Sequence, residues 1–332
     1  MTVIDPFGRT VNYLRVSVTD RCDFRCKYCM AENMTFLPKK DVLSLEELEL
    51  ITAAFIRKGA RKIRLTGGEP LVRKGIMELV TNLGRYLDSG ELDELTLTTN
   101  GSQLSKYAAQ LVDAGVKRLN VSLDTLDAKR FQEITRWGKL DTVMRGLDAA
   151  QNAGLKIKIN TVAVRGFNDY EVDDLIRWAG SRDMDITFIE TMPMGAIDEL
   201  RSEKFLPLSE LKESISKNWT LSSTDYKTGG PSDYMNIAET GNRVGFITPL
   251  SHNFCESCNR VRLTCTGMLY MCLGQEDSAD LKNVIRSENG IFKLDAAIDE
   301  AIGRKPKGHD FIIDRNSDQT PAVSRHMSVT GG

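Results

Sequence analysis

Six apolar segments with the composition of β-strands alternate with helical patterns in the first 190 residues of this 332-residue chain. The expected strands cover residues 13–18, 62–66, 94–98, 118–123, 156–164 and 186–190. Such alternation is typical of parallel strands joined by crossover helices. Six units fit an incomplete (β/α)6 TIM-like barrel, although a doubly wound open sheet would give a similar pattern. We therefore predict an α/β fold built on a partial barrel.

The helical patterns lie between these strands. The clearest one follows Ser44, which forms a capping box with Glu47 three residues later, and it ends at Gly59. Leu48 and Phe55 lie on its apolar face. Further helices are expected at about residues 74–87, 104–114, 142–153 and 171–179.

After about residue 200 the alternation stops. Short strands are expected at 235–237 and 243–247, a hairpin at 260–265 and 268–272 about Thr266-Gly267, and helices at 279–286 and 292–302. The chain ends in a polar tail with Gly331-Gly332. We predict a barrel domain over residues 1–200 and a smaller α+β module, which binds a second cluster, over residues 201–332.

The overall charge gives no sign of a polyanionic partner. Lys and Arg number 44 against 46 Asp and Glu, so the net charge is −2. Neither nucleic acid nor an anionic membrane is therefore expected as a partner, and any anionic ligand must be bound by locally placed arginines. No apolar run reaches the length of a membrane span, and residues 1–10 lack an export signal, so we expect a cytoplasmic protein.

The seven cysteines are an odd number in a chain without an export signal, which favours ligation or catalysis over disulfides. Six of them form two groups of three: the first cysteine set, Cys22, Cys26 and Cys29, and the second cysteine set, Cys255, Cys258 and Cys272. Cys265 is left over, and we expect it to be a small buried apolar residue.

Polar residues follow the expected strands at their carboxyl ends, where ligands gather in both candidate folds. Besides the first cysteine set they are Gly67–Pro70, Thr98–Gly101, Ser122, Asp124, Asn160 and Thr191–Pro193. We expect one pocket to be lined by all of them.

The first cysteine set offers three soft ligands, one fewer than a closed four-iron or structural zinc site requires. A zinc site and a redox pair at Cys26 and Cys29 are alternatives, but a thioredoxin-type pair does not need Cys22. The spacing of three and then two residues resembles the signature of radical S-adenosylmethionine (SAM) enzymes. That resemblance implies a four-iron cluster whose fourth iron binds SAM. Gly67-Gly68-Glu69-Pro70 resembles the superfamily loop that binds the methionine amino group through its backbone, and we expect glycine there because a Cβ would block the ligand.

The second cysteine set has the spacing Cys255-x2-Cys258-x13-Cys272 and again offers three thiolates. A zinc knuckle completed by the nearby His252 is the alternative. Arg260 and Arg262 occupy alternate positions of an expected strand, so their side chains point to one side. The alternative is that both side chains lie on a solvent-exposed face of the strand. Beside an open metal site, however, two arginines indicate an anionic or planar ligand.

Over nearly its whole length the chain resembles the GTP 3′,8-cyclase family of molybdenum cofactor biosynthesis. The resemblance is carried by residues 14–22, 63–71, 97–101, 120–124, 188–192 and 254–262, and by the terminal diglycine. It implies that Cys255, Cys258 and Cys272 hold a second four-iron cluster that binds the purine of GTP. It also implies that a 5′-deoxyadenosyl radical removes hydrogen from C3′ of GTP, after which C3′ attacks C8 of guanine.

The resemblance also implies residue roles. Expected SAM contacts are Tyr28, Gly68, Ser122 and Met192. Expected GTP contacts are Arg15, Arg64, Thr98, Lys158, Arg260 and Arg262, of which Arg260 and Arg262 are also the catalytic candidates. The diglycine tail is expected to reach into the active site.

The expected partners are GTP, an electron donor such as a flavodoxin or ferredoxin, and cyclic pyranopterin monophosphate synthase as the recipient of the product; a homodimer is a further candidate. Two rival functions stay open. One is a two-cluster radical SAM enzyme that modifies a peptide, for which a preceding peptide-binding module is expected, whereas the first strand starts at about Tyr13. The other is a non-catalytic zinc protein.

Overall fold

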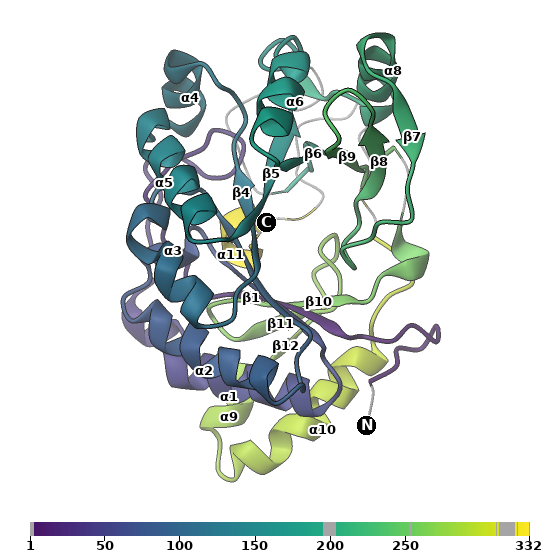
Figure 1. Cartoon of the computed structure of the whole chain (residues 1–332). Coiled ribbons are helices and arrows are strands. Elements are labelled where there is room, and N and C mark those ends of the chain that lie inside the picture. The colour runs from purple at the N-terminus through teal and green to yellow at the C-terminus, as the bar shows by residue number, and fades with distance from the viewer. Residues whose placement is uncertain are drawn as a thin grey trace.

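The computed structural model describes residues 3–194, 204–251, 254–309, 311, 323 and 325–331. Its centre is a curved sheet in the order β12-β11-β10-β1-β2-β3-β4-β5-β6-β9-β8-β7. Figure 1 shows helices along the outer side of this sheet and the short C-terminal helix α11 (Met327–Thr330) inside the curve. Within the described residues no helix is long and apolar enough to cross a membrane.

The six central strands run parallel in chain order and confirm the predicted α/β partial barrel. They are β1 (Tyr13–Ser17), β2 (Lys62–Thr66), β3 (Glu94–Thr99), β4 (Arg118–Ser122), β5 (Lys156–Ala163) and β6 (Asp185–Glu190). Their side chains alternate between the two faces of the sheet. Apolar residues such as Val16, Leu65 and Leu97 are buried toward the helices, and polar residues such as Arg15, Arg64 and Thr98 point into the hollow. This alternation places polar side chains of the central strands in the hollow, where they lie among apolar residues such as Val162 and Ile189.

Most of the outer helices lie where the sequence predicts them. They are α1 (Leu45–Arg57), α2 (Ile76–Asp88), α3 (Leu104–Asp113), α5 (Leu140–Asn152) and α6 (Val172–Ser181). At the start of α1 the Ser44 side chain accepts a hydrogen bond from the Glu47 amide at 3.1 Å, and the Ser44 amide donates to Glu47 Oε2 at 2.8 Å. The predicted capping box is therefore present.

Within the described residues three α-helices were missed, namely α4 (Ala128–Thr135), α8 (Leu208–Asn218) and the short α11. In α4 only Phe131, Ile134 and Thr135 are buried, so its apolar stripe is too short to show as a clear periodic pattern. The available signal was Asp127, whose carboxylate accepts a hydrogen bond from the Arg130 amide as an N-cap.

The C-terminal third of the chain extends the same sheet at both edges. Parallel to β1 runs β10 (Arg260–Leu263), and parallel to β6 runs β9 (Arg243–Ile247). The predicted hairpin about Gly267 is confirmed, since β11 (Met268–Tyr270) pairs antiparallel with β10. The outer strands are β8 (Asp233–Ile237), β7 (Leu221–Ser223) and β12 (Ser278–Asp280).

The two C-terminal helices are α9 (Leu281–Arg286) and α10 (Gly290–Gly303). A helix was predicted from residue 279, but residues 278–280 pair with β11 as strand β12. The Asp280 carboxylate accepts a hydrogen bond from the Asn283 amide at 2.8 Å. Asp280 is thus the N-cap, and α9 begins at the next residue, Leu281.

Replacing the capping residue tests how α1 begins. We expect Ser44→Ala to lower the free energy of unfolding by about 1 kcal/mol, because the Glu47 amide loses its acceptor. Chemical denaturation under anaerobic conditions measures the change. Ser105→Ala, an exposed serine in the first turn of α3, is the matched control and should have no measurable effect. Equal effects of the two substitutions would contradict the assignment of the cap.

Candidate active site

The hollow of the barrel contains a cavity of about 270 Å³. Its lining includes both cysteine sets and each of the individually named SAM and GTP contacts. Of the residues expected in this one pocket, Glu69, Pro70, Gly101 and Pro193 do not line it. Both cysteine sets, separated by more than two hundred residues of sequence, open into this one cavity. The structure therefore brings together the predicted site residues, while their individual roles remain predictions.

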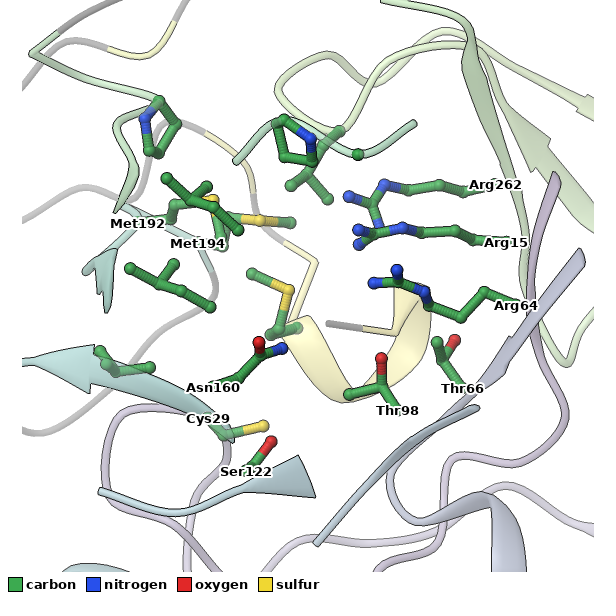
Figure 2. Close-up of a pocket in the computed structure, with 18 of the residues that line it drawn as sticks. Arg15, Cys29, Arg64, Thr66, Thr98, Ser122, Asn160, Met192, Met194 and Arg262 are labelled. Atoms are coloured by element: carbon green, nitrogen blue, oxygen red, sulfur yellow. The ribbon is translucent and has the colours of Figure 1, made fainter. Parts of the chain in front are cut away.

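Three arginines form a row across adjacent strands, which we call the arginine row: Arg262 on β10, Arg15 on β1 and Arg64 on β2. Strand register places Arg15 directly beside Arg262 on one side and Arg64 on the other. Figure 2 shows the three guanidinium groups pointing in the same direction into the cavity. The row thus concentrates positive charge on one wall.

Two members of the arginine row, Arg15 and Arg64, are buried and Arg262 is partly exposed, and the row lacks carboxylate partners within the described part of the chain. Arg15 is 6% exposed and Arg64 is 4% exposed, and the Nε atom of each lacks a hydrogen-bond partner among the described residues. Burial, with the neighbouring guanidinium groups, holds the pKa of Arg15 well below its usual value and lowers the pKa of Arg262 to about 10. Burying charge without a counter-charge is unfavourable, so this wall is suited to an anionic ligand.

Lys158 on β5 contributes a further cation. Its side chain is buried and its ammonium donates to the Tyr234 hydroxyl at 2.9 Å, so it is not part of a solvated strand face. Burial lowers the pKa of Lys158. Tyr234 lies on β8, and no local sequence signal connects it to a strand 76 residues earlier.

The C-terminal tail enters the cavity beside the arginine row. The Gly331 carbonyl accepts a hydrogen bond from Arg262 Nη1 at 2.8 Å. Gly331 has φ +74°, and a Cβ there would lie 1.8 Å from Thr66 Oγ1, so only glycine fits. The expected approach of the tail thus holds for Gly331, whereas Gly332 lies outside the described residues.

The first cysteine set lies in the loop that follows β1. The Phe24 amide donates to Cys22 Sγ at 3.3 Å, and Asn100 Nδ2 lies 3.7 Å from the same sulfur. Burial raises the pKa of Cys22 to about 12 and that of Cys26 well above its usual value. Thiolates at these positions therefore need a bound cation, and a soft iron centre fits this donor set.

The Gly67–Pro70 loop packs directly against the first cysteine loop. The amides of Gly68 and Glu69 donate to the carbonyls of Thr19 at 2.9 Å and Arg21 at 2.8 Å. A Cβ on Gly68 would lie 2.4 Å from the Arg21 carbonyl oxygen. Glycine is therefore required for contact between the two loops, while the expected approach of a ligand to this glycine stays a prediction.

Glu69 connects this loop to the loop after β3. Its carboxylate accepts from the Leu71 amide at 2.9 Å, the Thr99 hydroxyl at 2.8 Å and the Asn100 amide at 2.6 Å. Burial raises the pKa of Glu69 to about 7. Glu69 belongs to the predicted Gly67–Pro70 motif, but its positioning role was not predicted.

Tyr28 is positioned by Asp124, which follows β4. The Tyr28 hydroxyl donates to Asp124 Oδ2 at 2.6 Å, and the Val162 amide donates to Oδ1 at 2.9 Å. Burial raises the pKa of Asp124 to about 6. The other two expected SAM-contact side chains also line the cavity, Ser122 near Cys29 and Met192 after β6 (Figure 2).

In the second cysteine set, Cys255 and Cys258 lie between β9 and β10, and Cys272 lies in the loop after β11. Cys255 is the first residue of the 3₁₀ helix η3 (Cys255–Ser257). Arg260 Nη2 lies 4.0 Å from Cys258 Sγ, so Arg260 contacts the cysteines, while Arg262 joins the arginine row. Burial opposes ionisation of Cys258, but Arg260 and Lys305 together lower its pKa to about 7. This environment favours a bound thiolate.

The zinc alternatives receive no support from the described residues. No group of three His, Cys, Asp or Glu side chains there is arranged to hold one metal ion. Thiolates on a four-iron cluster bind different irons, so they are spaced more widely than ligands on one ion. His252 lies outside the described residues. Cys265 is fully buried and does not line the cavity.

Adding a methyl group at Gly68 tests the contact between the two loops. We expect Gly68→Ala to lower the free energy of unfolding by about 1 to 3 kcal/mol, because the new Cβ overlaps the Arg21 carbonyl. Gly303→Ala is the matched control, since a Cβ there meets nothing within 4 Å. Chemical denaturation of both variants measures the difference, and a Gly68→Ala protein as stable as the control would refute the contact.

Two family profiles match the chain in succession. The Radical SAM superfamily profile matches residues 16–179, which include the first cysteine set. The profile described as Molybdenum Cofactor Synthesis C matches residues 184–311, which include the second. SAM and an iron–sulfur cluster are therefore cofactors of this chain.

Solved structures with the same fold have low sequence identity to the chain. SuiB from Streptococcus suis has a TM-score of 0.59 at 16% identity, covering 87% of this chain and 67% of SuiB. SuiB bound to S-adenosylmethionine has a TM-score of 0.60 at 14% identity, covering 97% and 78%. These likenesses support the partial-barrel fold alone.

Curated relatives match along the whole chain. A protein from Mesorhizobium japonicum named GTP 3′,8-cyclase is 68% identical over 100% of both chains. Proteins of the same name from Agrobacterium fabrum and Brucella ovis are 66% and 64% identical over 99% of this chain, and cover 94% and 96% of their own lengths. At this identity and coverage, the chain belongs to the GTP 3′,8-cyclase family of radical SAM enzymes.

Proposed function

We propose that this chain binds GTP and cyclises it to (8S)-3′,8-cyclo-7,8-dihydroguanosine 5′-triphosphate, an early step of molybdenum cofactor biosynthesis. One observation carries the proposal: two three-cysteine sets open into the same cavity, and the arginine row, without carboxylate partners in the described residues, forms one of its walls. A triphosphate supplies the negative charge that this wall lacks.

The first cysteine set, Cys22, Cys26 and Cys29, would hold the cluster that binds SAM. When bound, this pair supplies a 5′-deoxyadenosyl radical for removal of hydrogen from C3′ of the ribose. Carbonyl groups of the Gly67–Pro70 loop can accept from the methionine ammonium, because the amides of Gly68 and Glu69 are already bonded to the first cysteine loop. Tyr28, Ser122 and Met192 complete the proposed SAM contacts.

The second cysteine set, Cys255, Cys258 and Cys272, would hold a second [4Fe–4S] cluster next to the purine of GTP. Support comes from the Cys258 thiol, whose pKa is held down by two neighbouring cations, and from the position of all three cysteines on the cavity wall. Each set lacks a fourth cysteine, which leaves a coordination position for a ligand of the cluster.

GTP would lie against the cationic wall. Arg15, Arg64, Arg262 and Lys158 would bind the phosphates, and Thr98 would contact the nucleotide from β3. Arg260, beside Cys258, would hold the purine end, so the catalytic candidates Arg260 and Arg262 contact different parts of one substrate. With both ligands bound, the walls of the cavity would limit the access of water to the reacting atoms.

The remaining predictions are also part of this proposal. They are a division into a radical SAM barrel at residues 1–200 and a C-terminal module at 201–332, a cytoplasmic location, a flavodoxin or ferredoxin as electron donor, transfer of product to cyclic pyranopterin monophosphate synthase, and a homodimer. The rival substrate, a peptide for a two-cluster radical SAM enzyme, would leave the arginine row without a dedicated anionic partner.

Anaerobic turnover tests the substrate. After reconstitution with iron and sulfide we expect about eight irons per chain, and formation of 5′-deoxyadenosine from SAM and dithionite only when GTP is present. Chromatography measures the nucleoside, and ATP in place of GTP is the matched control. Formation independent of GTP would overturn the substrate, and fewer than about six irons would overturn the two-cluster proposal.

Removing one ligand from the second cysteine set separates the two sites. We expect Cys272→Ala to lose GTP turnover but to retain SAM binding, because the first cysteine set is intact. Equilibrium dialysis measures SAM binding, and iron analysis should give about four irons per chain. Cys265→Ala, at a buried cysteine away from the cavity, should retain both activities. Loss of SAM binding in Cys272→Ala would show that the sites are not separable.

A further inference from the structure

Lys305 is a buried lysine directly behind the second cysteine set. It follows α10 and is 2% exposed. Its ammonium donates to the Met271 carbonyl at 2.6 Å and the Arg260 carbonyl at 3.0 Å, and lies 3.7 Å from Cys258 Sγ. No motif in the sequence analysis includes this residue.

The residues that follow Lys305 reach the other two cysteines. We call residues 305–309 the clamp segment. The Gly308 carbonyl oxygen lies 4.0 Å from Cys272 Sγ, and the His309 backbone hydrogen-bonds to the Cys255 thiol. Through Lys305, Gly308 and His309, the clamp segment thus contacts all three thiols of the second cysteine set.

Arg9 fastens the clamp segment to the N-terminal part of the chain. Its guanidinium donates to the carbonyls of Pro306 at 2.6 Å, Lys307 at 2.8 Å and Cys255 at 2.7 Å. One side chain therefore bridges the clamp segment and the first cysteine of the set, which fixes the distance between them.

The charge on Lys305 has no carboxylate partner among the residues that the structure describes. Its two carbonyl acceptors satisfy N–H groups but carry no net charge, so the cost of burying an ammonium is only partly offset. Thiolates are the nearest groups that can carry negative charge, and a cluster gains further negative charge on reduction. A fixed cation at this position therefore stabilises the reduced form more than the oxidised form.

We propose that Lys305 is a positioning residue that holds the backbone around the second cysteine set and supplies the buried positive charge that makes the second cluster easier to reduce. The inference rests on the proposed second cluster. It predicts that the charge, and not the hydrogen bonds alone, determines the redox equilibrium of that cluster.

The test uses the full-length chain with Cys22→Ala, Cys26→Ala and Cys29→Ala, so that only the second cluster forms. In this background Lys305→Gln removes the charge but keeps a hydrogen-bond donor, and Lys305→Met removes both. Lys305→Arg keeps the charge. Lys307→Met is the matched control, because Lys307 is an exposed cation of the same clamp segment. Iron content and electron paramagnetic resonance of the reduced cluster are recorded at fixed potentials.

We expect Lys305→Gln and Lys305→Met to lower the ratio of reduced to oxidised cluster at least about tenfold, or 59 mV for a one-electron couple. Lys305→Arg and Lys307→Met should remain near the parent ratio. A parent ratio in Lys305→Gln would overturn the inference, and it decides the question even if Lys305→Met fails to fold. Absence of iron from the parent background itself would instead overturn the second cluster, and with it this inference.

Discussion

The parallel pairing of β10 with β1 is the contact on which the active site depends. It joins the end of the chain to its first strand, and its register places Arg262 beside Arg15. The same pairing brings the second cysteine set to the barrel that carries the first. The residues that it brings side by side are more than two hundred positions apart in the sequence, and the pairing of β9 with β6 holds the other edge of the same sheet.

A second feature follows from this pairing, namely a concentration of buried positive charge. Arg15, Arg64 and Arg262 share one wall, Lys158 faces them, and Lys305 lies behind the second cysteine set. The chain as a whole has a net charge of −2, so this concentration is local. Like charges held together in a low-dielectric interior repel, and the proposed anionic substrate and second cluster would relieve that repulsion. Binding of an anionic ligand at this wall would therefore also stabilise the folded chain.

The alternation of strand and helix segments predicted the barrel well, because most residues of the central strands alternate between an apolar outer face and an inner face that lines the cavity. The ends of the six central strands were predicted within one residue. The misses have a common cause. Helix α4 buries few residues, and β12 is a strand only because it pairs with β11, so neither has a strong local pattern. Glu69 and Tyr234 were not assigned roles for the same reason, since their partners come from other strands.

The amino-acid sequence by itself determined the order of strands and helices, the spacing of the two cysteine sets, and the residue types that meet at the carboxyl ends of the strands. Local periodicity and short spacings encode these features directly. Only the tertiary structure decided that Arg262 adjoins Arg15, that Gly331 lies against Thr66, and that Lys305 contacts Cys258. Each of these contacts joins distant parts of the chain, and their geometry depends on sheet register and helix packing, which no local pattern specifies.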